Sequence, residues 1–572
     1  MTMKGISFMK KNVFMSDFET LTYLENGRTR VWAWGTVDIY NEESFVYGTD
    51  ISEWVEFVKR RRSSSIFYFH NLKFDGDFIV DWLLNNGWQY TENNKLKPNQ
   101  FTSLISDMGV WYSIKLRNSR VNIEIRDSLK IYNMSVEEIA KSFGFKEQKL
   151  KIDYNAKREI NHKLTDEEVI YLKHDVIIIA KAIRFMLDRG YEKLTAASNA
   201  LNFYKELIGG NEKFREIFPK LLCDKFIRKA YKGGFTYVSP KFKGKEVGEG
   251  IVLDANSMYP WAMKYNKFPY GEAEYFTGKY ETDEEYDLYF QSFSCSFYLK
   301  KGMIPTVQDK SSKYRWLPTE YIRDSDGIIM DFVMTNVDMK LFFEHYEVDD
   351  LTFTGGYKFK SKYGLFNEYI DYWYEQKRIA KSEGNKGMYL LSKLMLNSLY
   401  GKFASKIEGY SKIPYIGNDG VLHLKLGSLE EREPVYIPVG CFVTAYARDK
   451  IIRSAQKCYN RFMYADTDSL HLLGKEIPEG LEIDEYKLGA WKIEGEFKKA
   501  KYLRAKTYVE AEYNDYENKP FLKVTCAGLP DKARRNVTFE NFNYGSKYEG
   551  KLIPKRYPGG IILTPQTFEI KC

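Results

Sequence analysis

The sequence predicts a multidomain protein of mixed α/β and α+β class, on the basis of its length, composition and periodicity. The chain has 572 residues, whereas a single hydrophobic core stops growing at about 250–300 residues. Hydrophobic residues make up 44% of it and aromatic residues 16%, which is enough to bury several cores and excludes wholesale disorder. Segments with strand periodicity and segments with helix periodicity both occur.

Charge and cysteine content narrow the class of protein. Lys and Arg number 86 against 78 Asp and Glu, a net charge of +8 that suits a polyanionic partner without requiring one. The 6 cysteines form no C-x-x-C pair, which argues against a zinc site or a disulfide framework and fits a reducing cytosol. No apolar run of about 18 residues occurs, and residues 1–13 lack an apolar core of signal-peptide length. We therefore expect no membrane span and no secretion.

Roughly the first 190 residues are predicted to form an α/β unit, on the length prior for one domain. Segments 13–22 and 66–69 have the composition of strands. Segment 165–187 has helical spacing, and Thr165 with Glu168 three positions later has the pattern of a capping box at its start.

Two later segments have a readable local structure. Residues 365–403 have helical spacing that is broken by one serine and two glycines, at positions 382, 384 and 387. This pattern predicts a helix, a turn and a second helix that ends near Gly401. Between 411 and 426, the dipeptide Asp419-Gly420 separates two alternating runs, which is a strong signal for a hairpin.

Segment 462–472, FMYADTDSLHL, contains two acids separated by one threonine. Side chains on an extended strand alternate with a period of two residues, so we expect Asp466 and Asp468 to point to the same side. Two carboxylates held together at pH 7 repel each other unless a cation or a proton lies between them, and Mg²⁺ is a suitable cation. The alternative interpretation is an ordinary turn built from Asp and Thr.

Two other segments support the first interpretation. Strand-like residues 251–253 open onto Asp254 in the segment DANSMYP. Phosphoryl transfer needs metal ions that bridge the phosphates and the attacking hydroxyl, so Asp254 together with Asp468 is suited to hold two ions. In KLMLNSLYG, Lys393, Asn397 and Tyr400 fall on one helical face, where a lysine can hold a triphosphate and a tyrosine can support a base pair. Taken alone, this last pattern also fits a solvated helix face.

A second set of acids lies near the N-terminus. Asp17 and Glu19 fall on one face of a strand, and Asp75 and Asp175 follow in later segments. Tyr171 and Asp175 are spaced i to i+4, so one helical face presents a phenol beside an acid. These residues fit a two-metal nuclease site, in which one ion activates water and the other holds the leaving oxygen. Separately, each segment also fits an exposed strand edge or a turn.

Residues 231–234, YKGG, lie between the two sets of acids. Paired glycines allow backbone N–H groups to approach phosphates closely, although a Gly-Gly pair is also common in ordinary turns.

In this order, the motifs resemble those of the protein-primed family B DNA polymerases of small Bacillus phages, the phi29-like type. The resemblance runs from Asp17 to beyond Lys506. DANSMYP resembles motif A, KLMLNSLYGKF motif B, YADTDS motif C and residues 506–508 the K-x-Y motif that steadies the primer. The three acidic segments resemble motifs ExoI, ExoII and ExoIII, and YKGG resembles the YxGG linker between synthesis and editing.

The resemblance implies an N-terminal ribonuclease H-like 3′→5′ exonuclease domain, followed by a right-hand polymerase domain of palm, fingers and thumb with two insertions. The expected boundaries are 1–194 for the exonuclease domain, 195–265 and 438–526 for the palm, 266–364 for the first insertion (the terminal-protein region), 365–403 for the fingers, 404–437 for the second insertion with its hairpin, and 527–572 for the thumb.

The resemblance also implies roles for individual residues. At the polymerase site, Asp254, Ala255 and Asp468 are expected to bind metal, and Asp466 is expected to support catalysis. Around the nucleotide we expect Tyr259, which excludes a 2′-OH, and Lys377, Lys393, Asn397 and Tyr400. At the nuclease site, Asp17, Glu19, Asp75 and Asp175 are expected to bind metal with Tyr171 as a further catalytic residue. The expected DNA contacts are Thr20, His70, Asn71, Phe74, Ser128, Leu129, Lys149 (at the scissile phosphate), Tyr231, Gly233, Gly234, Ser257, Thr444, Arg448, Lys506 and Tyr508.

Two of the residues near the nuclease acids have a particular interpretation. His70 follows an apolar residue, where a lone histidine is commonly a satisfied structural residue; we interpret it as a DNA contact and not as a metal ligand. Asp77 stands where a small neutral residue is expected in this family, so its negative charge is expected to weaken the primer contact.

The implied function is template-directed, protein-primed DNA synthesis with proofreading, which copies a linear viral genome processively with strand displacement. Each active site is expected to use two Mg²⁺ ions, with Mn²⁺ able to replace them. The expected partners are primer-template DNA, deoxynucleoside triphosphates and a terminal protein that primes as a heterodimer with an otherwise monomeric, virus-encoded enzyme in the cytoplasm of a bacterial host. The alternatives are a conventional DNA-primed family B polymerase, a repair enzyme that uses one of the two sites, and a catalytically silent nucleic-acid-binding scaffold.

Overall fold

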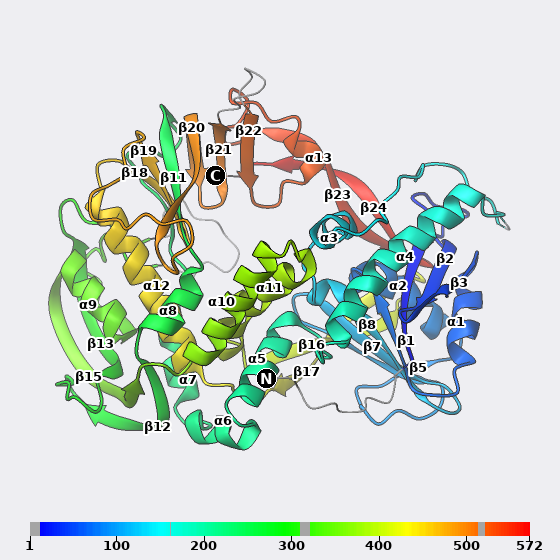
Figure 1. The fold of residues 1–572 in the computed structure, drawn as a ribbon, viewed down its shortest axis with the longest axis horizontal. Helices are drawn as coiled ribbons and strands as arrows, with labels where there is room; N and C mark the ends of the chain where they lie inside the picture. The colour runs from blue at the N-terminus through cyan, green and yellow to red at the C-terminus, as the bar shows by residue number, and fades with distance from the viewer. Residues whose placement is uncertain (1–11, 161, 309–320, 513–520, 572) are drawn as a thin grey trace.

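The computed structural model describes residues 12–160, 162–308, 321–512 and 521–571. Figure 1 shows the N-terminal sheet on one side of the molecule, a second large sheet on the other, and helices α10 and α11 between them. The multidomain α/β and α+β architecture that the sequence predicts is therefore confirmed. Five described cysteines are buried and free, and Cys572 lies outside the described residues.

The N-terminal sheet has eight strands in the order β3-β2-β1-β4-β8-β7-β6-β5. Strand β1 runs parallel to β4, and β4 runs parallel to β8, while β2 is antiparallel to β1. The strands are β1 (Asn12–Thr20), β2 (Val31–Asp38), β3 (Asn41–Gly48), β4 (Ser65–Phe69), β5 (Gln89–Tyr90), β6 (Gln100–Ile105), β7 (Trp111–Arg117) and β8 (Asn122–Asp127).

Helices cover both faces of this sheet. Because side chains alternate along β1, Met15 packs with Ile179 on one face, and Phe18 packs with Trp54 and Phe78 on the other. The predicted capping box is confirmed, since the Thr165 and Glu168 side chains each accept a hydrogen bond from the other residue's N–H. The helices are α1 (Ile51–Lys59), α2 (Leu72–Asn85), η1 (Ser128–Lys130), α3 (Val136–Phe143) and α4 (Asp166–Leu187).

Short helices connect the N-terminal sheet to the second large sheet, whose strand order is β22-β21-β20-β11-β19-β18-β9, with β10 paired to β20. The connecting helices are α5 (Ala196–Leu207), α6 (Asn211–Ile217), α7 (Asp224–Ile227) and η2 (Arg228–Ala230). The strands are β9 (Thr236–Val238), β10 (Glu246–Val247), β11 (Gly250–Ala255), β18 (Phe462–Asp466), β19 (Ser469–Leu473), β20 (Trp491–Arg504), β21 (Thr507–Glu512) and β22 (Phe521–Cys526). Two chain segments far apart in sequence therefore share one sheet, and the helices α8 (Met258–Tyr265) and α12 (Ile437–Lys457) pack with it.

A four-stranded antiparallel sheet follows α8, with the order β12-β15-β13-β14. Its elements are β12 (Phe268–Thr277), β13 (Leu288–Leu299), β14 (Met330–Thr335), α9 (Asn336–His345) and β15 (Tyr346–Lys362). The range 266–364, expected to be the first insertion, is therefore built mainly of strands.

The predicted helical pair and hairpin are also confirmed. Helices α10 (Asn367–Ser382) and α11 (Lys386–Phe403) are separated by a turn in which Gly384 has a φ of +66°. Strands β16 (Glu408–Ile416) and β17 (Leu422–Glu431) pair antiparallel across a turn in which Gly420 has a φ of +72°. Both glycines adopt a backbone conformation that side chains disfavour.

The chain ends with α13 (Asp531–Arg534) and a hairpin of β23 (Lys547–Tyr557) and β24 (Gly560–Glu569). In Figure 1 this hairpin reaches from the second large sheet to the N-terminal sheet, where β24 contacts α2. Among the described residues, no helix combines the length and the apolar character that a bilayer crossing requires.

Candidate active sites

The acids of the polymerase motifs lie on neighbouring strands of the second large sheet. Strand β11 pairs with β19, so that Asp254 stands opposite Ser469. Strand β18 ends at Asp466, and β19 begins three residues later. Thr467 between them has a φ of +62°, and the N–H of Asp468 donates to the carbonyl oxygen of Asp466 at 2.6 Å. The expectation of an extended strand through both acids is therefore wrong, because the backbone turns at Thr467.

This turn directs Asp468 towards Asp254. The N–H of Ala255 donates to the carbonyl oxygen of Asp468 at 2.8 Å, which joins the two motifs through their backbones. Burial and then the charge of Asp254 raise the pKa of Asp468 to about 6. Burial also raises the pKa of Asp254, although Lys492 Nζ, 3.3 Å from its Oδ1, opposes the rise. The two carboxylates repel each other and fit a divalent cation between them.

Asp466 has a different environment. Lys506 Nζ lies 2.9 Å from its Oδ1 and 3.2 Å from its Oδ2, and the Thr236 hydroxyl donates to Oδ1 at 3.3 Å. This carboxylate therefore has its own counter-charge, which agrees with a supporting role. Lys506 belongs to the K-x-Y segment, while Tyr508 is buried and its ring lies 5.0 Å from that of Tyr464.

The structure adds two residues that the motifs did not reveal. Lys492 and Glu494 lie on β20, beside β11, and the charge of Glu494 contributes to the raised pKa of both Asp254 and Asp468. The alternation W-K-I-E over 491–494 is the sequence signal, because a strand of period two presents both charged side chains on one face.

Positive charge from the helical pair faces these acids. Burial and then the charges of Lys393 and Lys492 lower the pKa of Lys377, so the three lysines lie within electrostatic reach of one another. The charge of Lys393 also opposes the raised pKa of Asp254. Lys393 and Asn397 are both exposed on α11, as the spacing predicted. Clustered lysines beside paired acids suit the binding of a nucleoside triphosphate.

Two tyrosines and a glycine pack together beside these acids. The ring centroids of Tyr259 and Tyr400 lie 4.1 Å apart. A Cβ atom on Gly234 would lie 2.8 Å from Thr467 Cγ2 and 3.2 Å from the Tyr259 hydroxyl, so only glycine lets segment 231–234 approach so closely. Ser257, with a φ of +48°, is the N-cap residue of α8, the helix that carries Tyr259.

Thr444 and Arg448 are both buried in α12. Arg448 forms two hydrogen bonds to Asp338, of 3.0 and 2.7 Å, and donates at 2.7 Å to the carbonyl oxygens of Lys232 and Gly233. The Thr444 hydroxyl donates to backbone carbonyls of its own helix. Their contact with DNA stays a prediction, and the structure places Arg448 behind the segment 231–234 that it supports.

The acids of the nuclease motifs meet at a separate site. Carboxylate oxygens of Asp17, Glu19 and Asp175 lie within 4.8 Å of one another, two from β1 and one from α4. Burial and then the charge of Asp175 raise the pKa of Asp17 to about 7. Burial followed by the charge of Asp17 raises the pKa of Glu19 and of Asp75 well above their ordinary values.

One lysine compensates part of this negative charge. Lys149 Nζ lies 2.6 Å from Asp175 Oδ2, and although burial alone lowers the pKa of Lys149, the charge of Asp175 raises it overall. The other oxygen of that carboxylate, Asp175 Oδ1, is buried without a hydrogen-bond partner. Buried carboxylates in excess over their counter-charges, with one oxygen unpaired, fit a site for divalent cations.

Tyr171 is 2% exposed and binds two groups in this site. Lys149 Nζ donates to its hydroxyl at 3.3 Å, and the hydroxyl of Tyr154 lies 2.8 Å from it. Tyr154 is a site residue that no motif indicated, because the connection that carries it has no periodicity.

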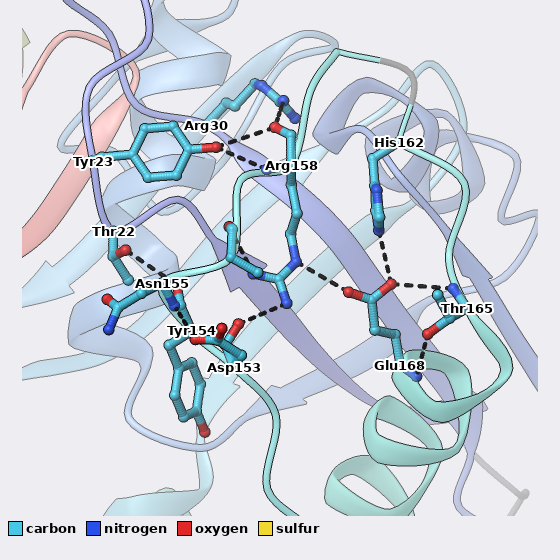
Figure 2. Close-up of polar contacts among 11 residues, drawn as sticks. Thr22, Tyr23, Arg30, Asp153, Tyr154, Asn155, Arg158, His162, Thr165 and Glu168 are labelled. Atoms are coloured by element: carbon cyan, nitrogen blue, oxygen red, sulfur yellow. Dashed lines mark hydrogen bonds and ion pairs between the residues drawn. The ribbon is translucent and has the colours of Figure 1, made fainter.

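The connection after Lys149 is anchored by a buried arginine. Figure 2 shows Arg158 between Glu168 at the start of α4 and the backbone near Asp153. Its Nε donates to Glu168 Oε1 at 3.1 Å, an Nη donates to the carbonyl oxygen of Asp153 at 2.9 Å, and its guanidinium lies 3.9 Å from the ring centre of Trp32. These contacts hold the backbone on either side of Tyr154.

A pocket of about 340 Å³ opens beside these acids. The predicted DNA contacts Thr20, His70, Asn71, Phe74 and Lys149 line it. A further lining residue, Leu563, comes from β24 at the far end of the chain.

Three predicted contacts have structural roles here. His70 uses both ring nitrogens, at 2.9 Å from the Ser128 hydroxyl and 2.9 Å from the Met134 carbonyl oxygen, and burial lowers its pKa. Ser128 is fully buried beneath it, and the N–H of Leu129 donates to Asp127 at 2.9 Å. The polar atoms of His70 are therefore satisfied by the protein, while its ring lines the pocket.

Asp77 has a partner that the sequence did not indicate. Its side chain is fully buried and accepts hydrogen bonds from Arg556, of 2.7 Å to Oδ1 and 3.3 Å to Oδ2. Its charge faces the C-terminal hairpin, and its expected effect on the primer contact stays a prediction.

Paired acids in a β-sheet that a lysine-bearing helical pair approaches suit a nucleic-acid polymerase, and the second cluster of acids suits divalent cations. The chain matches the family described as DNA polymerase type B, organellar and viral, over residues 58–163 and 151–485, and belongs to it.

Full-length relatives agree with this assignment. The chain is 42% identical to the DNA polymerase of Bacillus phage phi29, over 98% of this chain and 100% of the relative. It is 34% identical to the DNA polymerase of Streptococcus phage Cp-1, over 98% of each. Its structure superposes on that of phi29 DNA polymerase complexed with primer-template DNA and incoming nucleotide substrates with a TM-score of 0.92, at 41% identity, covering 98% of this chain and 100% of that one.

The protein is therefore a phi29-like, DNA-directed DNA polymerase, as the motifs predicted. The alternative of a catalytically silent scaffold is removed. Membership of this family implies the use of divalent metal ions, which the buried acids fit.

Proposed function

We propose that this polymerase extends primers at Asp254 and Asp468 with two divalent ions, Mg²⁺ or Mn²⁺. The observation that supports this most directly is the pairing of these two acids with raised pKa values across β11 and the β18–β19 turn. When bound, the ions polarise the phosphates and lower the pKa of the primer hydroxyl. The relative of known structure carries primer-template DNA and incoming nucleotides.

The protein's own residues orient the substrates. Lys377 and Lys393 bind the triphosphate, and the closely packed rings of Tyr259 and Tyr400 support the nascent base pair. Asp466 and Lys506 neutralise each other beside the primer end. The segment 231–234, supported by Arg448, lies along the path of the primer towards the second site.

The second site is proposed to edit the primer as a 3′→5′ exonuclease. Asp17, Glu19, Asp75 and Asp175 hold two divalent ions, which when bound supply an activated water and stabilise the leaving oxygen. Lys149 orients Asp175, since its ammonium donates hydrogen bonds to both Asp175 and Tyr171. The same ammonium is proposed to contact the scissile phosphate. Phe74 and the ring of His70 offer surfaces on which bases can stack.

Removing acids from one site tests the division of labour. The double variant Asp17→Ala with Asp75→Ala is expected to stop degradation of a 3′-labelled single-stranded oligonucleotide while primer extension persists. Asp107→Ala, an exposed acid of the same domain, is the matched control and should change neither activity. Unchanged degradation by the double variant would mean that these acids do not edit.

Initiation is proposed to use a hydroxyl of a terminal protein, with which the polymerase forms a heterodimer. The support is the 98% coverage of this chain by relatives of the phi29 type, which includes both insertions, 266–364 and 404–437. Incubation with the terminal protein of the same genome, a template and labelled dATP, but no nucleic-acid primer, should give a labelled protein adduct. No adduct with an enzyme that extends DNA primers would favour the conventional DNA-primed alternative.

The proposed setting is replication of a linear viral genome, with strand displacement, in the cytoplasm of a bacterial host. The β16–β17 hairpin contacts both the N-terminal domain and the C-terminal hairpin, an arrangement that suits a grip on DNA. Ser411 of β16 forms a β-bridge with Ser106, and a Cβ atom on Gly420 would lie 4.0 Å from Pro558 of the C-terminal hairpin. On a primed circular single strand, this enzyme should make products longer than one circle even with excess competitor DNA. Products that stop at one circle would contradict strand displacement.

A further inference from the structure

The tip of the C-terminal hairpin packs against the N-terminal domain. The N–H of Thr29 donates to the carbonyl oxygen of Pro558 at 3.0 Å, and Ile561 is buried in the same core as Phe78 of α2. A Cβ atom on Gly560 would lie 2.2 Å from the Phe78 ring, so the hairpin approaches α2 as closely as glycine allows. Figure 1 shows the hairpin of β23 and β24, a two-stranded sheet of its own, reaching from the region of α13 to the N-terminal sheet.

An ion pair joins the same two elements. Arg556 donates to both oxygens of Asp77, at 2.7 and 3.3 Å, across 479 residues of sequence. The Asp77 side chain is 0% exposed and that of Arg556 is 28% exposed. A two-bond arginine–carboxylate pair fixes direction as well as distance. Removal of one partner leaves the other unpaired in a buried place, which is strongly unfavourable.

The position of this pair connects it to the nuclease pocket. Arg556 stands opposite Ile561 in the hairpin register, and Leu563 lies two residues further along β24. Residues two apart on a strand point to the same face, so Ile561 in the core and Leu563 at the pocket wall are set by the same docking. A hairpin held at Arg556 therefore holds Leu563 as well.

We propose that Asp77 and Arg556 are a positioning pair for editing: their ion pair holds the C-terminal hairpin against α2 so that Leu563 forms one wall of the pocket that receives the single-stranded 3′ end. The inference rests on the proposed exonuclease function. Neither residue touches the reacting phosphodiester; the pair acts through the hairpin. Its loss should weaken the hold on the 3′ end and leave the chemical step unchanged.

Four variants of the full-length enzyme test the pair: Asp77→Asn, Arg556→Gln, the double variant, and Arg556→Lys. The assay is degradation of a 3′-labelled single-stranded oligonucleotide with Mg²⁺, measured over a range of oligonucleotide concentrations. Each neutral single variant should raise KM by about tenfold, with kcat within about twofold, because a buried pair is broken. The double variant should be no worse than the worse single variant, since coupled residues are not additive. Arg556→Lys keeps the charge and should recover part of the affinity.

Lys555→Gln is the matched control, because it removes one positive charge from the neighbouring position of the same strand. It should leave KM within about twofold of the parent, as surface changes usually do. If it raised KM as much as Arg556→Gln, net charge and not the pair would explain the effect. An unchanged KM in both single variants, or a loss of kcat alone, would overturn the inference.

Hydrogen exchange of the backbone amides in 547–569 gives a readout that needs no nuclease activity. The single variants should exchange faster there than the parent, and Lys555→Gln should not. Fast exchange with an unchanged KM rejects the positioning role while the nuclease itself stands. If the variant Asp17→Ala with Asp75→Ala degrades DNA as fast as the parent, the proposed nuclease function itself is wrong. In that case only the exchange data show whether the pair of Asp77 and Arg556 holds the hairpin in place.

Discussion

The hydroxyl of Tyr154 lies 2.8 Å from the hydroxyl of Tyr171, between an irregular connection and helix α4. The acids of this site come from regular elements, whereas Tyr154 comes from a loop that Arg158 anchors to Glu168. The phenol of Tyr171 is thereby held from two sides, by Tyr154 and by Lys149.

Removing the Tyr154 hydroxyl should loosen Tyr171 without disturbing the fold. One hydrogen bond contributes about 0.5–1.5 kcal/mol, so Tyr154→Phe should slow degradation of single-stranded DNA by about three- to tenfold. Tyr47→Phe, on an exposed tyrosine of β3, is the control and should have no effect. Equal rates for Tyr154→Phe and the parent would show that the contact between the hydroxyls does not support editing.

The two acids of the YADTDS turn should differ in importance. Asp468 faces Asp254, whereas Asp466 is paired with Lys506. A metal ion contributes several kcal/mol to transition-state stabilisation, so Asp468→Asn should lower the kcat of primer extension by about 10³-fold or more. Asp466→Asn should lower it less, because the pair with Lys506 is replaced by a neutral contact. Steady-state extension with a single nucleotide measures both, and equal losses would contradict the separate environments of the two acids.

Tyr259 should control the choice of sugar. Its ring packs at 4.1 Å against Tyr400 and is partly buried, within electrostatic reach of Asp468. Tyr259→Val opens space at this position and should raise the ratio of ribonucleotide to deoxynucleotide kcat/KM by about 10–100-fold. Tyr265→Val, an exposed tyrosine at the end of the same helix, should leave the ratio unchanged. An unaltered ratio in Tyr259→Val would assign the sugar choice to another residue.

The buried pair of Asp338 and Arg448 should stabilise the protein in a pH-dependent way. Burial alone raises the pKa of Asp338, but Arg448 outweighs it and lowers the pKa below its ordinary value of 3.8. A carboxyl with a lowered folded pKa stabilises the fold at pH values above its unfolded pKa, and this contribution is lost as the pH falls through the folded pKa. Asp338→Asn should therefore lower the free energy of unfolding by about 3–5 kcal/mol at pH 7, the usual result of breaking a buried pair.

Urea unfolding of parent and variant at several pH values measures this difference. The gap should stay constant between pH 7 and pH 5 and narrow only below the ordinary value of 3.8. Glu375→Gln, which breaks an exposed pair with Arg378, is the control and should give no resolvable change. A gap that closes already between pH 7 and pH 5 would contradict the lowered pKa.

Local sequence patterns predicted several elements of the fold and the residues that meet in both sites. The capping box at Thr165, the helical pair 365–403 and the hairpin at Asp419-Gly420 all follow from the spacing of neighbouring residues, and all are confirmed. The convergence of Asp17, Glu19 and Asp175 was also readable, because each belongs to a motif of known order.

Local patterns did not indicate the features that one dihedral angle or one distant partner decided. Thr467 takes a φ of +62°, so the two acids beside it leave the extended strand that their spacing indicated. The burial of Arg448 follows from Asp338, which lies in another segment of the chain. Asp77 pairs with Arg556, which lies 479 residues away, so no local pattern indicated this partner.

The sequence alone therefore sufficed for the family and for several of the regular elements, since periodicity, capping and motif order depend on residues close along the chain. Only the folded chain revealed that Tyr154 contacts Tyr171 in the proposed nuclease site, that Glu494 lies near the polymerase acids, and that Asp77 pairs with Arg556 of the C-terminal hairpin. These contacts join residues far apart in sequence, and their free energy comes from burial and charge pairing that exist only once the domains have packed.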